Sequence, residues 1–428
     1  MVRFRSLFLA FLILLWEGVP IALFGGSRFL GPHAVSVFVL FGIIIYFLKY
    51  KNRNRIDVWF LTPILLLIYC IFVTVISSMF FYENPATDWV PALVNYSPLL
   101  LIFLLEAMAV EIEDVLQAIL IVAFTASIFL VVNVFFDLPF LQQYKTYSGF
   151  EMTNNRFILL KNETAFGIVI SLVRFFRFAN LKSLILYGFI ISICIYSIVV
   201  VQEVRLVVGA LFISLLCIFT FLFDKKAKFL FSAVVFCFSL SVAPIIFAKY
   251  IDRASSTSNY AVEDSSVRWR LITVDHYYEY YKETFNIGFG IMSTSPDNSN
   301  ILTYSYYKAS QLYGDAGYWG VYLADLSLLS ALYQFGIVGL AFVVFMSASV
   351  CTVLIRFSRR KDIPYASDVG AVGFLMTFLI VSPWPLNFFT LSWPLMGGNV
   401  LWYLAALCAR LRREEHSIGV TERQVLAL

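Results

Sequence analysis

The sequence predicts an all-α polytopic membrane protein with about 12 transmembrane helices and one long, partly helical extracytoplasmic loop. Hydrophobic residues make up 61% of the chain and charged residues 14%, whereas a soluble domain carries about 25% charged residues. Apolar runs recur at about the 20 residues that a helix needs to cross the hydrocarbon core. This pattern excludes a soluble enzyme, a nucleic-acid-binding domain and a disordered protein.

The apolar runs divide the chain into three parts. Residues 1–249 contain the first nine predicted spans, residues 250–329 form the long loop, and residues 330–428 contain the last three spans and a tail. The first run resembles a signal peptide, but Glu17 interrupts it and no small-residue cleavage site follows, so we expect an uncleaved helix. The predicted spans lie near residues 6–24, 31–48, 58–80, 92–110, 114–136, 162–179, 183–201, 206–223, 229–249, 330–355, 369–389 and 394–409.

Basic residues between the spans predict the orientation, whereas the formal net charge of +4 does not. Each basic cluster follows an even-numbered span. Because positively charged loops stay in the cytoplasm, we expect both termini there and the long loop on the outer side. The clusters contain Lys49, Lys51, Arg53, Arg55, Arg174, Arg177, Lys182, Lys225, Lys226, Lys228, Arg356, Arg359, Arg360, Lys361, Arg410, Arg412 and Arg413.

The cysteines predict neither a disulfide framework nor a metal site. All six lie inside apolar runs, and none has a CxxC or a Cys/His ligand spacing. We therefore interpret them as small apolar packing residues. They are Cys70, Cys194, Cys217, Cys237, Cys351 and Cys408.

A short outer turn carries the first candidate site. Glu203 and Arg205 lie between two otherwise uncharged spans, and Arg205 is followed at once by apolar residues. An arginine fork binds phosphate oxygens in a bidentate manner and never loses its charge. The alternative is that Arg205 extends to the membrane surface and pairs with Glu203.

The long loop carries the second candidate site. Helical spacing after Asp264 predicts an amphipathic helix with Arg268 and Arg270 on its charged faces. His276, on the same helix, is a candidate general base. The alternative for all three residues is a solvated helix face with i,i+4 pairing.

Three further residues follow in the loop. Gly288 and Gly290 allow the backbone to approach another group closely or to turn sharply. No phosphate-binding GxxxxGK[ST] motif is present. Asp325 begins the helix that leads into the tenth span, where an acid also complements the helix dipole in the ordinary way.

Together these segments resemble the O-antigen polymerase and ligase superfamily of integral membrane glycan enzymes. The turn that ends in Arg205 is similar to that family's outer turn with a critical arginine. Residues 265–271 with Gly288 and Gly290 resemble its arginine-bearing loop helix and GxG. Residues 325–329 and 335–339 resemble its acid-led segment and its Gly-Ile-x-Gly helix entry, and Asn162 matches an asparagine before a span.

The resemblance implies a GT-C-like fold in the bacterial inner (cytoplasmic) membrane and a metal-independent glycosyltransferase without cofactors. Such a polymerase transfers a glycan chain from undecaprenyl diphosphate onto the non-reducing end of a lipid-linked repeat unit. Arg205, Arg268 and Arg270 are then the expected catalytic cations, because the leaving diphosphate needs positive charge. The resemblance implies a lipid-linked oligosaccharide and the bilayer as partners, together with a chain-length regulator and a flippase, and no nucleic acid. The expected substrate-binding residues are Arg156, Glu203, His276, Asp325, Gly288 and Gly290.

Two alternatives stay open. A ligase of the same superfamily carries a histidine near the last long-loop helix, where this chain has Ala324 and Asp325, and this difference favours a polymerase. A lipid-linked oligosaccharide flippase also has about twelve spans, but transporters of that kind contain internal repeats, and the sequence shows none. The sequence does not distinguish whether the polysaccharide product is O-antigen, capsule or exopolysaccharide.

Overall fold

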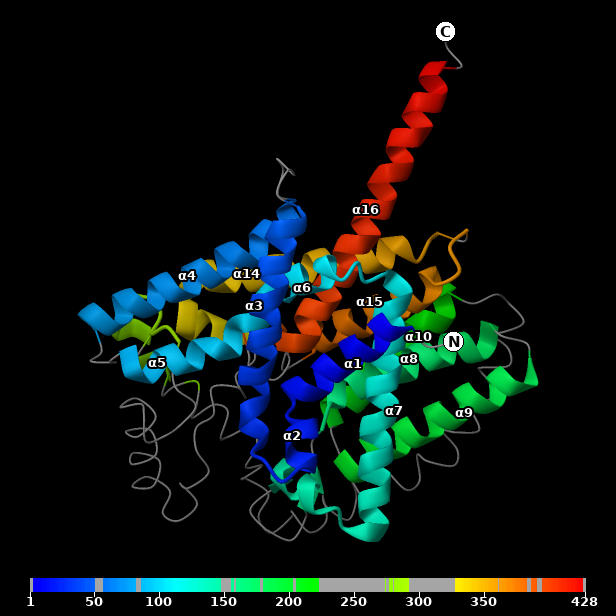
Figure 1. Cartoon of the computed structure of the whole chain (residues 1–428), viewed down its shortest axis with the longest axis horizontal. Coiled ribbons are helices and arrows are strands. Elements are labelled where there is room, and N and C mark those ends of the chain that lie inside the picture. Colours follow the sequence, from blue (N-terminus) through cyan, green and yellow to red (C-terminus); the bar gives the residue numbers. More distant parts are fainter. Residues whose placement is uncertain are drawn as a thin grey trace, which may run out of the picture.

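In the residues that it describes, the computed structural model is helical with one small hairpin (Figure 1). The described residues are 3–50, 57–81, 86–147, 155–157, 159–177, 180–202, 205–222, 274, 277–279, 281–291, 328–360, 362–382, 386–390 and 395–425.

The long helices follow the apolar runs of the sequence. Among the described residues, helices lie at every predicted span, and the predicted span near 229–249 lies outside them. The helices are α1 (Phe4–Trp16), α2 (Val19–Leu23), α3 (Gly31–Lys49), α4 (Val58–Phe80), α5 (Ala86–Leu93), α6 (Leu101–Ala107), α7 (Ile112–Phe136), α8 (Lys161–Arg177), α9 (Leu181–Tyr196), α10 (Arg205–Leu222), α14 (Leu328–Phe357), α15 (Ala366–Val381) and α16 (Leu395–Val425).

Short irregular elements join these helices. Three turns are 3-10 helical, η1 (Arg28–Leu30), η2 (Val94–Leu100) and η3 (Pro139–Tyr144), and η4 (Ser197–Gln202) is a π-helical turn. Strands β1 (Lys145–Tyr147) and β2 (Asn155–Phe157) form an antiparallel hairpin that the sequence analysis did not predict.

Within the described ranges, six helical stretches are long and apolar enough to cross a membrane, by length and composition. This confirms the predicted all-helical, membrane-type architecture, whereas the number of twelve spans and the GT-C fold stay predictions. The six stretches are Arg28–Lys49, Val58–Phe80, Trp89–Ala107, Ile112–Phe136, Leu181–Gln202 and Leu328–Phe357.

The helix α8 is largely enclosed by protein. It packs against α7, α9, α10 and α15, and its buried residues include Asn162, Glu163 and Arg174. Polar and charged residues at membrane depth are tolerated where they face protein rather than lipid. The central position of α8 therefore allows the charges that its sequence carries.

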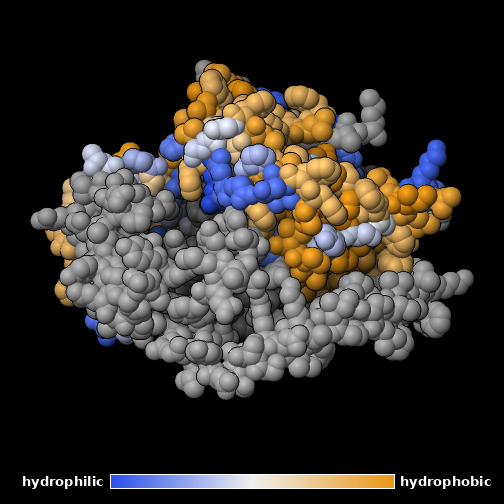
Figure 2. All heavy atoms as spheres, turned by 90° about the horizontal axis from the view of Figure 1, so that it is seen from below, coloured by the Kyte–Doolittle hydropathy of each residue, from blue (hydrophilic) through white to orange (hydrophobic). Residues whose placement is uncertain are grey.

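The outer surface is largely apolar. Large hydrophobic side chains are exposed along α3, α4 and α9, among them Phe41, Phe72 and Phe189. Seen from below, hydrophobic residues cover much of the described surface, with a hydrophilic patch near the middle of that face (Figure 2). Apolar patches of this extent are unusual on soluble monomers and match a surface in contact with lipid tails.

The helices define two ends of the molecule. We call one the terminal side, because Arg3 and Arg410 lie there together with the turns after α6 and α14. We call the other the hairpin side, which contains the turn between α2 and α3, η3 and the β1–β2 hairpin. In Figure 1 the turn between α2 and α3 lies at the bottom, and α16 runs to the C-terminus at the top.

Candidate functional site

A break between α1 and α2 places a carboxylate on the hairpin side. Glu17 caps α1, and Gly18 follows with a left-handed backbone that ends the helix. A Cβ on Gly18 would overlap the backbone of Arg28, so the break packs directly against the next turn. Glu17 is 7% exposed and interacts electrostatically with Arg28.

Tyr144 fixes the position of this pair. Its buried hydroxyl donates a hydrogen bond to the Glu17 carbonyl oxygen at 2.7 Å, and the Arg28 guanidinium lies 5.1 Å from the centroid of its ring. Burial, with a smaller contribution from Glu17, raises the pKa of Tyr144 above its ordinary value. Tyr144 therefore stays a hydrogen-bond donor at neutral pH.

The first turn of α8 brings a second carboxylate to the same place. Glu163 is 8% exposed and interacts electrostatically with Glu17, and Lys161 acts on both carboxylates. A Cβ on Gly397 would lie 2.7 Å from Glu163 Oε1, so the glycine in α16 leaves room for this side chain. The hairpin side thus combines two buried carboxylates with the cations of Arg28 and Lys161.

Two buried amides lie on the elements next to these carboxylates. Within the described part of the chain, Asn162 Oδ1 and Gln202 Oε1 are buried without a hydrogen-bond partner. Buried carbonyl oxygens without a donor are costly, so these positions suit a ligand or a water that donates hydrogen bonds.

The β1–β2 hairpin brings two predicted arginine segments together. Arg156 lies in β2 opposite Thr146, and β2 packs against η4. The turn η4 ends at Gln202, three residues before Arg205 begins α10. The backbone of the Arg156 segment is therefore adjacent to the segment that leads into Arg205; the two side chains lie outside the described atoms.

Gly288 and Gly290 are buried in a backbone contact with α4 and α14. The amide of Phe289 donates to the Tyr333 carbonyl at 3.1 Å, and the amide of Gly290 donates to the Gln334 carbonyl at 2.7 Å. A Cβ on Gly290 would lie 2.5 Å from Thr74 Cα, and the residue has a φ of +81°. Of the two roles expected for these glycines, a close backbone approach or a sharp turn, the contacts show a close approach at both, and a substrate role stays a prediction.

The other predicted site residues lie outside the described residues. These are Glu203, Arg268, Arg270, His276 and Asp325. Their convergence with Arg205 stays a prediction. Within the described ranges, no group of three His, Cys, Asp or Glu residues could hold a metal ion.

The sequence analysis did not single out Arg28, Tyr144, Lys161 or Glu163 as site residues. One signal was present for Glu163, because it is an acid next to Asn162 at the start of a predicted span. The proximity of Glu17 and Glu163 could not be predicted, because they lie far apart in the sequence and meet only through packing.

Comparison with protein-family models and with curated proteins found no match to this chain.

Proposed function

We propose that this protein is a membrane polysaccharide polymerase. It transfers a glycan chain from undecaprenyl diphosphate onto the non-reducing end of a lipid-linked repeat unit. The observation that carries the proposal is the grouping on the hairpin side of two buried carboxylates, Glu17 and Glu163, with Arg28, Lys161 and the adjoining segments of Arg156 and Arg205.

The cations have a direct role in this chemistry. When the glycosidic bond to the lipid diphosphate breaks, the diphosphate leaves with the bonding electrons and gains negative charge. Groups fixed where that charge develops stabilise the transition state. Arg205, Arg268 and Arg270 supply this charge in the proposal, and Arg28 and Lys161 add to the field around the donor.

The carboxylates have a complementary role. The acceptor hydroxyl forms the new bond to the anomeric carbon and must lose its proton, which a carboxylate can take as a general base. Glu163 is the base that we favour, because it is buried beside Gly397 and the Oδ1 of its neighbour Asn162 has no hydrogen-bond partner among the described residues. Glu203, His276 and Asp325 are the alternatives from the sequence.

The test uses a polymerase-null strain that expresses single variants. We expect Arg205→Ala, Arg268→Ala and Glu163→Gln each to abolish long-chain glycan while single capped repeats persist in electrophoretic profiles of surface polysaccharide. A general base accelerates a reaction by about 10²- to 10⁴-fold. Its removal by the isosteric Glu163→Gln change is therefore enough to abolish long-chain glycan. Arg412→Ala and Asp362→Asn, on exposed residues of the terminal side, are the matched controls.

The outcomes separate the three functions. Normal long-chain polysaccharide ladders from the arginine variants would overturn the proposal that the protein is a polymerase. Loss of single capped repeats as well would indicate a ligase, because no glycan then reaches its final acceptor. Accumulation of lipid-linked repeats on the cytoplasmic leaflet would indicate a flippase.

A further inference from the structure

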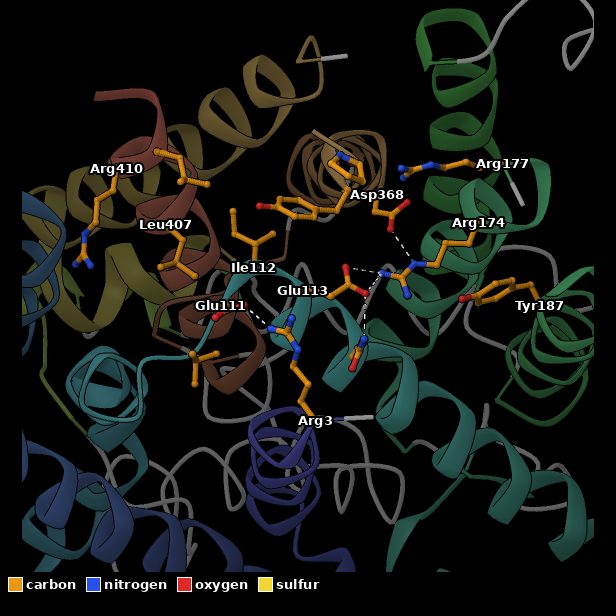
Figure 3. Close-up of a pocket in the computed structure, with 15 residues that line it drawn as sticks. Arg3, Glu111, Ile112, Glu113, Arg174, Arg177, Tyr187, Asp368, Leu407 and Arg410 are labelled. Carbon is orange, nitrogen blue, oxygen red and sulfur yellow. Dashed lines mark hydrogen bonds and ion pairs between the residues drawn. The ribbon is translucent and has the colours of Figure 1, made fainter. Parts of the chain in front are cut away.

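The terminal side contains a pocket that the proposed function does not use. Its volume is about 810 Å³, within the range of small-molecule sites. Figure 3 shows the lining side chains converging from α7, α8, α9, α15 and α16 and from the residue before α1. They are Arg3, Val110, Glu111, Ile112, Glu113, Gln117, Arg174, Arg177, Tyr187, Pro364, Tyr365, Asp368, Leu407, Arg410 and Leu411.

Arg174 is shared between two acids in the wall of this pocket. Its Nε donates to Asp368 Oδ2 at 2.8 Å, and its second guanidinium nitrogen donates to Glu113 Oε1 at 3.0 Å. Arg174 thus divides its hydrogen bonds between two carboxylates, and Arg177 is a second cation that lines the same wall.

One oxygen of Asp368 is unsatisfied within the part of the chain that the structure describes. The Asp368 side chain is 2% exposed, and among the described residues Oδ1 has no hydrogen-bond partner. A buried charged oxygen without a donor is costly. This cost favours a charged hydrogen-bond donor, such as an ammonium, at Oδ1.

A second cation lies beside Asp368. Arg177 points toward Asp368 in Figure 3 and acts on it electrostatically, and its side chain is exposed at the mouth of the pocket. A guanidinium has five N–H donors, so Arg177 can bind an anion while keeping its other contacts. The pocket therefore places a carboxylate that can bind a cation, Asp368, next to a guanidinium that can bind an anion, Arg177.

We propose that this pocket binds a zwitterionic phosphate ester, with a primary ammonium on Asp368 Oδ1 and a phosphate on Arg177. The arginine fork fits phosphate in a bidentate manner. Apolar side chains from Ile112, Leu407 and Leu411 line part of the pocket. Two sources share this chemistry, the head group of an ethanolamine phospholipid and a soluble phosphoethanolamine. The site is separate from the hairpin side and independent of the proposed polymerase.

The test uses the full-length protein in detergent micelles, titrated calorimetrically with O-phosphoethanolamine. We expect Arg177→Gln to weaken binding by about tenfold or more, since hydrogen bonds to charged groups contribute about 1.5–3 kcal/mol. Arg412→Gln, which alters an exposed arginine outside the pocket, should bind as the wild type does. The proposal is overturned if the wild type binds neither O-phosphoethanolamine nor phosphatidylethanolamine. It is also overturned if Arg177→Gln binds O-phosphoethanolamine as well as the wild type does.

Two further experiments test the ammonium site at Asp368 and the source of the ligand. Asp368→Asn should weaken binding of O-phosphoethanolamine but not of inorganic phosphate, and equal loss of both would contradict the ammonium site. If Asp368→Asn does not fold, Arg177→Gln still decides, because its side chain is exposed. Native mass spectrometry after reconstitution with phosphatidylethanolamine and phosphatidylglycerol tests the lipid source, for which we expect selective retention of phosphatidylethanolamine that Arg177→Gln abolishes.

Discussion

At the scale of the residue, several buried charges of the described chain occur in specific pairs. Arg410 donates to both oxygens of Glu106 at 2.8 Å, and the Tyr403 hydroxyl lies 3.4 Å from the same carboxylate. Arg174 binds Asp368 and Glu113. Breaking such a pair on one side leaves a buried charge uncompensated, which costs more than the pair itself contributes.

Arg174→Gln should therefore destabilise the protein strongly. We expect a loss of about 3–5 kcal/mol in the free energy of unfolding, because Asp368 is left as a buried carboxylate. The measurement is denaturant- or heat-induced unfolding of the purified protein in micelles. The double variant Arg174→Gln/Asp368→Asn should be more stable than the single variant; if it is less stable, the two residues do not act as a pair. Arg412→Gln is the control.

The same scale shows what the sequence could and could not indicate about the candidate site. Glu17 was visible as a charge that interrupts an apolar run, and Asn162 and Arg205 were visible through the family resemblance. Arg28 and Tyr144 have no such signal, because an arginine and a tyrosine near a span edge are ordinary at membrane interfaces. Only packing of η3 against α2 brings Tyr144 to the Glu17 carbonyl.

At the scale of the element, the kink in α14 explains two motifs of the sequence. Gly336 interrupts the helix with φ +66° and ψ −170°, which frees the preceding carbonyls from the helical pattern. The amides of Phe289 and Gly290 bind the carbonyls of Tyr333 and Gln334, and the Tyr69 hydroxyl binds that of Phe335 at 3.0 Å. The loop segment thus satisfies the groups that the kink exposes, as buried backbone requires.

This packing predicts that Gly336→Ala destabilises the protein. The residue needs a left-handed backbone, and a Cβ would lie 2.6 Å from the Ile287 carbonyl oxygen. We expect a loss of about 1–3 kcal/mol from the backbone conformation alone, and more from the overlap, measured as a lower unfolding midpoint. Gly290→Ala should behave in the same way.

The chain provides a matched control for this prediction. A Cβ on Gly209, in the exposed part of α10, would have nothing within 4 Å. Gly209→Ala should therefore be neutral or stabilising by about 0.4–1 kcal/mol. Equal effects of the Gly336 and Gly209 substitutions would show that the kink contact does not contribute to stability.

At the scale of the whole molecule, the two ends carry different chemistry. The hairpin side contains Glu17 and Glu163, and the terminal side contains the arginine-lined pocket. Arg356, in the last turn of α14, and Arg359, just after it, lie on the terminal side, which we predict from the positive-inside rule to face the cytoplasm. The two proposed sites would then lie on opposite faces of the membrane.

Cysteine labelling tests this orientation. In a variant whose native cysteines are replaced, we expect Ser27→Cys to react with a membrane-impermeant maleimide in cells whose inner membrane is intact. Asp362→Cys should react only after the inner membrane is permeabilised, because it lies in the turn between α14 and α15 on the terminal side. Both positions are exposed in the structure. Labelling of both from the same side would contradict the predicted orientation.

The sequence alone determined the helical membrane-type architecture and the close backbone approach at Gly288 and Gly290. It could do so because apolar run length and the lack of a Cβ act locally, whatever the rest of the chain does. Only the tertiary structure decided that Glu163 lies close enough to Glu17 to act on it electrostatically, that Arg174 joins α7, α8 and α15, and that Gly288 and Gly290 pack against a kinked helix. These contacts join residues far apart in the chain, and helix packing sets them through shape rather than through any pattern along the sequence.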